Sequence, residues 1–465
     1  MIGLTRLKPS NKGIKINYAI WHPYTQMSEW NKHQKRVITR GDGFYLVDQN
    51  GTRYLDGIAS MWCNVWGHGK NEILQVMIEQ LHNIQHSTLF GLSSRASMEL
   101  AEKLLKIAKG MHYVFYSDNG STAIEVAMKM ALQYWRNKGN HKKVRFISME
   151  NGYHGDTIGA MSIGYVPKYF SVYRPLINPA IKVPSPKSIC LRENPYTRSR
   201  RRNSVEQYYI DKLEDILLKH ASHCCALVME SGAQVAGGAR IYPKRYQRKV
   251  ADLCKKYSVL LILDEIATGF GRLGNMIEYL AQSSIPDIVC FGKSLTAGYS
   301  PLAVTLTTNE IFNEFLGNYS ENRQLYHGHT YTGHTLGCSA ASANIELYRK
   351  YNLIDKIRSN SEYLHKRLEQ IENSYSITQR TRCKGLLGAI DLVHSNGWNA
   401  EPIEMLKDKC TINSFIFQES LKLGVFLRSL GNTILIIPPL AINKSDLGFL
   451  LDVIHELIRR VERLL

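Results

Sequence analysis

The strongest constraint on the fold is the alternation of apolar runs with helical patterns between about residues 71 and 325. A short apolar strand that alternates with helices is usually buried on both faces. The pattern therefore predicts an α/β fold with a mainly parallel sheet wrapped by helices. The expected strands are "YVFYS", "KVRFISM", "CALVME" and "VLLILDE", and the clearest helices are "NEILQVMIEQLHNI" and "SRASMELAEKLLKIA".

Two further regions flank this one. In the first, "GFYLVDQNGTRYLDG" holds two alternating runs joined by Asn50-Gly51, which predicts a hairpin. From about residue 326, a long helical stretch to Ile371 precedes the strand patterns "LLGAIDLV", "GVFLRSL" and "TILIIPPL" and a closing helix from Lys444. We expect a segment at 1–70 that joins a small domain, a large domain at 71–325, and at 326–465 the end of the large domain and a C-terminal α+β domain.

The net charge of +18 raises the question of a nucleic-acid partner. The one dense basic run, Thr197 to Arg202, lies in a stretch rich in Pro, Ser and Asn, Pro184 to Ser204. We expect that stretch to be a solvated surface loop. No helix-turn-helix, zinc-finger or RNP pattern accompanies it, so we expect no nucleic acid as a partner.

Targeting and redox signals predict a cytoplasmic protein. No run approaches the roughly 18 apolar residues of a membrane span, and the basic N-terminus lacks an apolar signal core. The nine cysteines include no C-x-x-C pair, which argues against a disulfide framework and for a reducing compartment. No membrane partner is expected.

Ligands of an open parallel sheet bind beyond the carboxyl ends of its strands. After "YVFYS", a helix is expected to begin at Ser121 or Thr122. Asn119, Gly120, Ser121 and Thr122 would then present N–H groups and hydroxyls to a phosphate at its positive end. An ordinary helix cap is the alternative. After "KVRFISM", Tyr153 could stack on a flat cofactor ring or simply pack.

Two charged residues follow later strands. Asp264 ends the apolar run "VLLIL", where it could pair with a pyridinium nitrogen or bond to nearby backbone. Lys293 follows another apolar run, and is either a buried amine that bonds to a carbonyl compound or a lysine with its head in water. We call the phosphate-binding start of the helix after "YVFYS" the anion cradle. Together, the cradle, the aromatic ring, the carboxylate and the amine are the groups needed to hold pyridoxal 5′-phosphate.

The stretches "LILDEIATGFGRLG" and "CFGKSLTAGYSPLA" resemble the signature of the class III pyridoxal-phosphate aminotransferases of fold type I. The resemblance covers nearly the whole chain. It implies a mainly parallel seven-stranded sheet, pyridoxal 5′-phosphate as the cofactor, and a homodimer with shared active sites. Four stretches resemble the branch that aminates 8-amino-7-oxononanoate to 7,8-diaminononanoate in biotin biosynthesis: "AIWHPYTQM", "DNGSTAIEVAMKMALQYW", "NGYHGDTIGAMSIG" and "HGHTYTGHTLGCSAA".

The resemblance also implies residue roles. Lys293 would form the Schiff base and move a proton, Asp264 would pair with the ring nitrogen, and Arg428 would take the substrate carboxylate. The implied catalytic residues are Lys293, Tyr24 and Tyr153. The implied cofactor-binding residues are Gly120, Ser121, Tyr153, Gln234, Asp264, Lys293 and, from the other subunit, Thr330. The implied substrate contacts are Tyr24, Met61, Trp62, Gly328, His329 and Arg428.

Two departures leave the amino donor open. Members that use S-adenosylmethionine have two adjacent tryptophans where this chain has Met61-Trp62, and a proline where it has His329. S-adenosylmethionine is the expected small-molecule donor, and L-lysine is the alternative. Another class III reaction, on an ω-amino acid, is the other alternative. The spacing of His327, His329 and His334 matches no metal-ligand pattern, so no metal is expected.

Overall fold

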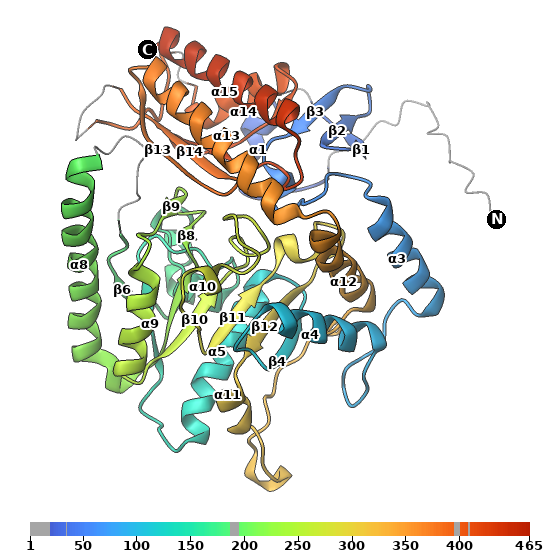
Figure 1. The fold of residues 1–465 in the computed structure, drawn as a ribbon, viewed down its shortest axis with the longest axis vertical. Coiled ribbons are helices and arrows are strands. Elements are labelled where there is room, and N and C mark those ends of the chain that lie inside the picture. The colour runs from blue at the N-terminus through green and yellow to red at the C-terminus, as the bar shows by residue number, and fades with distance from the viewer. Residues whose placement is uncertain (1–18, 34, 187–194, 395–399, 408–409) are drawn as a thin grey trace.

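A seven-stranded sheet forms the centre of the molecule (Figure 1). The computed structural model describes residues 19–33, 35–186, 195–394, 400–407 and 410–465. In spatial order the strands are β4 (Tyr113–Ser117), β12 (Ala303–Thr307), β11 (Ile288–Phe291), β10 (Leu260–Asp264), β7 (Cys224–Glu230), β5 (Arg145–Met149) and β6 (Ile181–Val183). Only β12 runs antiparallel to its neighbours, which confirms the predicted mainly parallel sheet.

The central strands β7 and β10 are buried on both faces because they are apolar up to their last residue. Side chains alternate between the two faces of a strand. In β10, Ile262 belongs to one apolar cluster with α5 (Gly120–Asn137), whereas Leu261 and Leu263 belong to another with α4 (Arg95–Ile107), α9 (Tyr246–Lys256) and α12 (Thr335–Lys350). Continuous apolar runs therefore identified β7 and β10 correctly.

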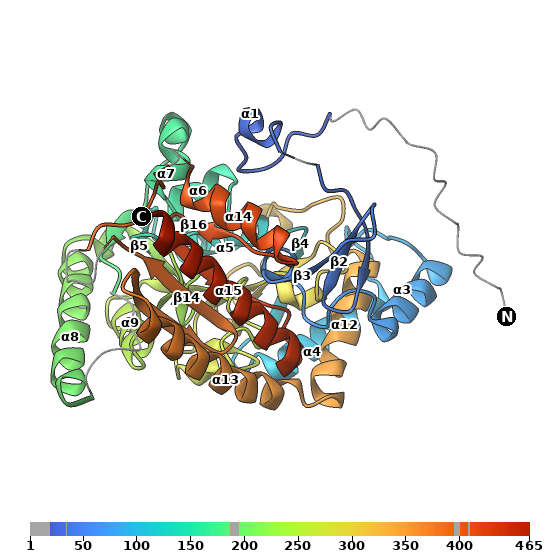
Figure 2. The ribbon, with the colours of Figure 1, turned by 90° about the horizontal axis from the view of Figure 1, so that it is seen from above.

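The N-terminal hairpin joins the C-terminal end of the chain in a second sheet. Its strands lie in the order β1 (Ile38–Asp42), β2 (Tyr45–Asp48), β3 (Arg53–Asp56) and β15 (Val425–Phe426). β2 and β3 pair antiparallel across the predicted turn, and β15 pairs parallel with β3. Figure 2 shows these strands beside α14 (Ile412–Lys422) and α15 (Lys444–Leu464). The division into 1–70, 71–325 and 326–465 stays a prediction.

A third sheet lies under the C-terminal helices. Its order is β13 (Thr378–Lys384), β14 (Leu387–Leu392), β17 (Thr433–Ile436) and β16 (Ser429–Leu430), and a small two-stranded sheet pairs β8 (Ala233–Gln234) with β9 (Arg240–Ile241). The predicted strand "GVFLRSL" is thus two short strands in different sheets.

The other helices are α1 (Met27–Trp30), α2 (Ala59–Trp62), α3 (Asn71–Asn83), α6 (Ile158–Ile163), α7 (Pro167–Phe170), α10 (Glu278–Ala281), α11 (Asn309–Asn313) and α13 (Leu353–Ser374), with 3₁₀ turns η1 (Ser171–Leu176), η2 (Ala221–His223), η3 (Lys293–Thr296) and η4 (Tyr319–Glu321).

The dense basic run is not in a loop, so that prediction is wrong. Helix α8 (Pro195–His220) contains residues 197–202 and lies at the outer edge of the molecule (Figure 1). Proline is tolerated at the start of a helix and arginine is a good helix former, whereas Ser and Asn suggested a loop. Residues 187–194, also expected in the loop, lie outside the described residues.

The long helical stretch predicted up to Ile371 is present as two helices. It is divided into α12 and α13, and Asn352 between them has a left-handed φ of 48°. Asparagine tolerates this conformation better than most residues. The break lets the two helices pack on different elements: α12 on α3 and α4, and α13 on β13 and α15. No helix within the described residues is long and apolar enough to cross a membrane.

A hydrogen bond between side chains ties the hairpin to the last helix, and its removal should weaken the fold. The Tyr45 hydroxyl donates to Asp446 Oδ1 at 2.5 Å. We expect Tyr45→Phe to lower the free energy of unfolding by about 0.5–1.5 kcal/mol in urea denaturation. Tyr319→Phe is the control because that side chain is 92% exposed, and it should be close to neutral. Equal stability of the two variants would contradict the prediction.

Candidate active site

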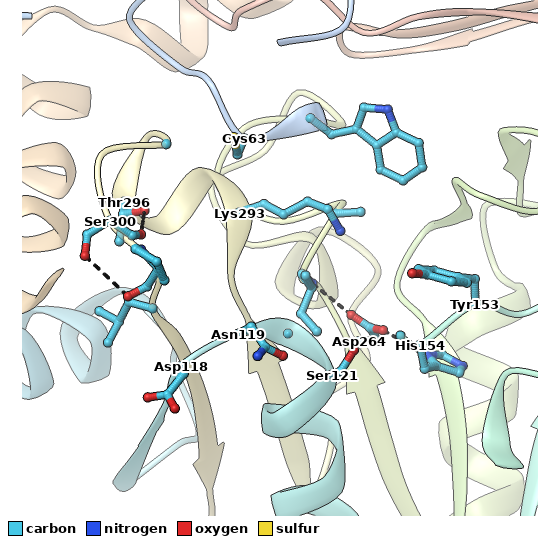
Figure 3. Close-up of a pocket in the computed structure, with 18 of the residues that line it drawn as sticks. Cys63, Asp118, Asn119, Ser121, Tyr153, His154, Asp264, Lys293, Thr296 and Ser300 are labelled. Atoms are coloured by element: carbon cyan, nitrogen blue, oxygen red, sulfur yellow. Dashed lines mark hydrogen bonds and ion pairs between the residues drawn. The ribbon is translucent and has the colours of Figure 1, made fainter. Parts of the chain in front are cut away.

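A cavity of about 540 Å³ opens at the carboxyl ends of the sheet strands (Figure 3). Residues that follow different strands line it together: Asn119 after β4, Tyr153 after β5, Glu230 at the end of β7, Asp264 at the end of β10 and Lys293 after β11. The predicted cradle, aromatic ring, carboxylate and amine therefore share one space, as expected for the ligand end of a parallel sheet.

Asp264 is held at the cavity by two hydrogen bonds. It is 4% exposed, and its Oδ1 accepts a bond from the Ile266 N–H at 2.9 Å. Its Oδ2 lies 2.8 Å from Nδ1 of the buried His154. The other ring nitrogen of His154 is buried and has no partner among the described residues. A buried carboxylate needs such partners, and these fix its orientation.

Lys293 lies in a strained turn directly after β11. Its φ of 43° is left-handed, a conformation that costs energy in a residue other than glycine. Nζ lies 5.3 Å from the centroid of the Trp62 ring. Burial lowers the pKa of the Lys293 ammonium, although the nearby carboxylates of Asp264 and Glu230 oppose the shift. The amine is therefore neutral at a lower pH than an ordinary lysine.

The N-terminus of α5 lies at the cavity, where the anion cradle was predicted. The helix begins at Gly120, one residue earlier than the earliest predicted start, and Asn119 caps it by accepting a bond from the Thr122 N–H at 3.1 Å. Gly120 and Ser121, which lie between Asn119 and Thr122, line the cavity. A Cβ on Gly120 would lie 2.9 Å from Ile266 Cγ2, so a larger residue would need the wall to move. First-turn N–H groups and a hydroxyl suit a phosphate.

Two tyrosine hydroxyls share one carboxylate oxygen beside the cavity. Tyr24 donates to Asp156 Oδ1 at 2.5 Å, and Tyr153 donates to the same atom at 3.1 Å. Burial raises the pKa of both phenols, and Asp156 adds to each shift. The Asp156 N–H in turn donates to Ser121 Oγ at 3.1 Å. Asp156 therefore links the N-terminal segment, the Tyr153 loop and the anion cradle.

The substrate residues predicted near the N-terminus divide into a buried and an exposed group. Trp62 is 8% exposed and lines the cavity, next to Cys63. Met61 is 51% exposed and, like Trp62, has a left-handed φ. Tyr24 is 53% exposed and lies outside the cavity lining, edge-on to Tyr169 at 5.5 Å between ring centroids. The two strained residues thus turn the chain sharply at the cavity wall.

Several predicted site residues lie away from the cavity lining in this chain. Gln234 is buried, but its amide oxygen accepts a bond from Ser185 and its amide nitrogen donates to the Glu150 carbonyl, both at 2.8 Å. Arg428 is exposed, close enough to Tyr169 to oppose the burial that raises the pKa of that phenol. Met61 also lies outside the lining, as do three residues of one loop, Gly328, His329 and Thr330.

The loop that holds Gly328, His329 and Thr330 approaches the cavity at His329. His329 Nδ1 lies 3.7 Å from Oδ2 of Asp118, which lines the cavity. His329 Nε2 also lies 3.2 Å from His327 Nε2. Thr330 is exposed. In the part of the chain that the structure describes, no group of three or more His, Cys, Asp or Glu side chains could hold a metal ion.

Three residues of the site were missed from the sequence: His154, Asp156 and Glu230. Glu230 ends β7 as Asp264 ends β10, so the same signal, a carboxylate after an apolar strand, was present. Its oxygens accept bonds from the N–H groups of Tyr153 at 3.2 Å and Val235 at 2.9 Å. Burial raises the pKa of Glu230 to about 8, and the charge of Asp264 adds to the shift.

The site fits one type of small molecule. The cradle suits a phosphate, the Asp264 carboxylate suits a protonated ring nitrogen, and a neutral lysine can bond to a carbonyl carbon. The Tyr153 ring lines the same cavity, on the side where His154 meets Asp264 (Figure 3). A flat phosphorylated pyridine aldehyde, pyridoxal 5′-phosphate, carries all the matching groups.

Comparison with known proteins gives one consistent result. The family model described as aminotransferase class-III matches residues 26–458. The protein of Methanocaldococcus jannaschii named adenosylmethionine-8-amino-7-oxononanoate aminotransferase is 38% identical over 459 residues, which cover 95% of this chain and 96% of that protein. The protein of the same name from Geobacter sulfurreducens is 40% identical over 443 residues, with coverage of 95% and 96%.

Solved structures agree with this result. The crystal structure of the M. jannaschii protein superimposes with a TM-score of 0.87 at 38% identity and covers 96% of this chain and 97% of that one. An amine transaminase from an uncultivated Pseudomonas species, solved in its PLP-bound form, gives a TM-score of 0.86 at 31% identity, with coverage of 95% and 99%.

The raised pKa of Glu230 predicts a pH-dependent stability in the cofactor-free chain. Between pH 4.5 and about 8 the folded state keeps a proton that the unfolded state has lost, so this group makes stability fall as pH rises. Glu230→Gln lacks the titration. The unfolding free energy of Glu230→Gln minus that of the unmodified chain should therefore increase with pH, by up to about 1.4 kcal/mol per unit.

Urea denaturation at several pH values measures this difference. Glu79→Gln is the matched control, because Glu79 is an exposed carboxylate on α3. The unfolding free energy of Glu79→Gln minus that of the unmodified chain should stay constant over the same pH range. A constant difference for Glu230→Gln as well would refute the assignment.

Proposed function

Because this chain belongs to the class III aminotransferase family, we propose that it aminates 8-amino-7-oxononanoate to 7,8-diaminononanoate in biotin biosynthesis, with pyridoxal 5′-phosphate as cofactor and S-adenosylmethionine as amino donor. The observation that carries the proposal is the pair of relatives with this name, 38% and 40% identical over 95% of the chain. The convergence of Lys293, Asp264 and the α5 N-terminus on one cavity supports it.

Pyridoxal 5′-phosphate supplies an electron sink that stabilises negative charge on the carbon bonded to the amine nitrogen. Asp264 is assigned to the ring nitrogen, which it would keep protonated. Its two hydrogen bonds, from Ile266 N–H and with His154, hold the carboxylate in place for this contact. An ion pair in a buried site is strong enough to keep that proton in place.

Lys293 is assigned two tasks, a covalent bond to the cofactor and proton transfer. Both need a neutral amine, and burial lowers its pKa in that direction. Its strained backbone turns the side chain from the end of β11 into the cavity. The amine can then take a proton from the reacting carbon and return it elsewhere on the same face.

The other residues hold the cofactor and substrates in place. Gly120 and Ser121 are assigned to the phosphate, and Tyr153 to the face of the ring. Tyr24, Met61 and Trp62 would line the path of the substrate, and Arg428 would capture its carboxylate, for which a guanidinium is well suited. The position of Arg428 near Tyr169, which touches Tyr24, supports one continuous path. Gln234 is assigned to the wall that supports the cofactor, since both ends of its amide are bonded to protein.

We also propose a homodimer in which Gly328, His329 and Thr330 complete the active site of the other subunit. Two observations support this arrangement. All three residues lie outside the lining of their own cavity. Next to them, Phe90 is 74% exposed, and a Cβ on Gly328 would lie 2.9 Å from its ring. A large exposed ring beside a functional loop is typical of a subunit interface.

A cytoplasmic location is proposed from the cysteines. Cys225, Cys254 and Cys290 are buried as free thiols, and burial raises the pKa of each. Buried reduced thiols are usual in a reducing compartment.

Replacement of Lys293 provides the first test. Lys293→Ala should reduce amine transfer by at least about 10²–10⁴-fold, because the base is lost, and should abolish covalent attachment of the cofactor. Borohydride reduction followed by mass spectrometry measures that attachment. Lys182→Ala is the matched control: Lys182 is another lysine whose pKa burial lowers, to about 8, but it bonds to Ser148 and Ile163 outside the cavity lining. Attachment that survives in Lys293→Ala would refute the assignment.

The acceptor and donor are tested in one assay. Purified protein with the cofactor is given 8-amino-7-oxononanoate together with S-adenosylmethionine, L-lysine or no donor, and 7,8-diaminononanoate is measured. We expect product with S-adenosylmethionine. If product forms with L-lysine and not with S-adenosylmethionine, then L-lysine is the amino donor and the proposed acceptor is unchanged. No product with either donor, alongside transfer to 2-oxoglutarate from an ω-amino acid, would overturn the proposed reaction.

A further inference from the structure

One buried helix contacts both loops that carry the charged residues of the cavity. In α12, the Asn344 amide donates to the carbonyl oxygens of Ser294 at 2.8 Å and Leu295 at 2.9 Å, the two residues after Lys293. One turn later, the Tyr348 hydroxyl donates to the Phe270 carbonyl at 2.6 Å, in the loop after Asp264. Residues four apart lie on the same face of a helix, so one face of α12 holds both loops.

Both loops need external support because their backbones are strained. Lys293 and Ala297, at the two ends of the η3 turn, have left-handed φ angles of 43° and 53°, and Phe270 has one of 51°. Such conformations persist in residues other than glycine only when surrounding contacts enforce them. The two bonds from Asn344 fall on the middle of the η3 turn, between its two strained positions.

Trp66 fixes the orientation of the Asn344 amide. Its Nε1–H donates to Asn344 Oδ1 at 2.7 Å, so the amide oxygen is occupied and the amide nitrogen faces the two carbonyls. The Trp66 ring also meets the Tyr348 ring edge-on, 5.7 Å between centroids at 73°. Asn344 is fully buried, and Trp66 and Tyr348 pack in the same apolar cluster. Every polar atom of the Asn344 side chain therefore has a partner.

We propose that Trp66, Asn344 and Tyr348 form a buried support that positions Lys293 relative to Asp264, with Asn344 as its central positioning residue. None of the three is among the residues that line the cavity, so the support acts only through the loops that it holds. The inference rests on the proposed role of Lys293 in the reaction. A lysine displaced by even a fraction of an ångström would meet its carbon and proton in poorer geometry.

The experiment compares three variants of the full chain loaded with pyridoxal 5′-phosphate. Asn344→Leu keeps the side-chain size and removes all three hydrogen bonds. Trp66→Phe leaves the two Asn344 donors but releases the amide oxygen that orients them. Asn360→Leu is the matched control, because Asn360 is also buried in a helix and donates at 2.7 Å to one carbonyl, that of Ile442, away from the cavity.

Three quantities are measured: kcat and KM for amine transfer, the pH midpoint of the visible absorbance of lysine-bound cofactor, and the thermal midpoint. Asn344→Leu should lower kcat by roughly 10- to 100-fold with little change in KM, since the loss of buried partners acts on the reacting geometry. It should also move the pH midpoint. Trp66→Phe should show the same changes, smaller in size. Asn360→Leu should lose thermal stability but keep kcat and the pH midpoint.

The outcomes separate the support from the proposed function. If Asn344→Leu does not fold, Trp66→Phe decides. The support would be overturned if every folded variant of Asn344 and Trp66 kept the kcat and the pH midpoint of the unmodified enzyme. It would also be overturned if Asn360→Leu lost as much kcat as Asn344→Leu. Failure of the unmodified protein to attach the cofactor through Lys293 would instead overturn the proposed function on which the support rests.

Discussion

The site depends on charged groups placed at the ends of strands that are otherwise wholly apolar. Every residue of β7 and β10 is buried, and each strand ends in a carboxylate, Glu230 and Asp264. Burial without partners would be too costly, so the surrounding loops supply N–H groups and one imidazole. The charge of Asp264 adds to the raised pKa of Glu230, and both carboxyl groups oppose the burial that lowers the pKa of Lys293. Perturbed groups gathered at one edge of a sheet are typical of a functional site.

The sheet and the residues at its strand ends were predictable because both follow from local pattern. An apolar run of strand length between two helices is usually a buried strand of a parallel sheet. The residue after such a run then lies at the carboxyl edge of the sheet, where ligands bind. Asp264 and Lys293 were found in this way. The antiparallel β12 and the strand β13 were missed because their sequences, "AVTLT" and "TQRTRCK", are short or largely polar.

The supporting residues could not be predicted because their partners are distant in sequence. His154 meets Asp264, Trp66 meets Asn344, and Tyr24 meets Asp156 only after the chain has folded. Nothing in the local sequence around Asn344 distinguishes it from the other polar residues of α12. The resemblance to a known family named Tyr24 and Arg428, whereas their joint relation to Tyr169 came from the structure.

The pairing of β3 with β15 has a consequence for how the protein is made. β15 lies far beyond β3 in the sequence, so during synthesis β3 has an unpaired edge until Val425 and Phe426 have left the ribosome. Contacts of such large sequence separation form slowly, and an open edge invites pairing with other chains. Since Met61 and Trp62 follow β3 directly, we expect the cavity wall to be completed late and the nascent chain to benefit from chaperone protection.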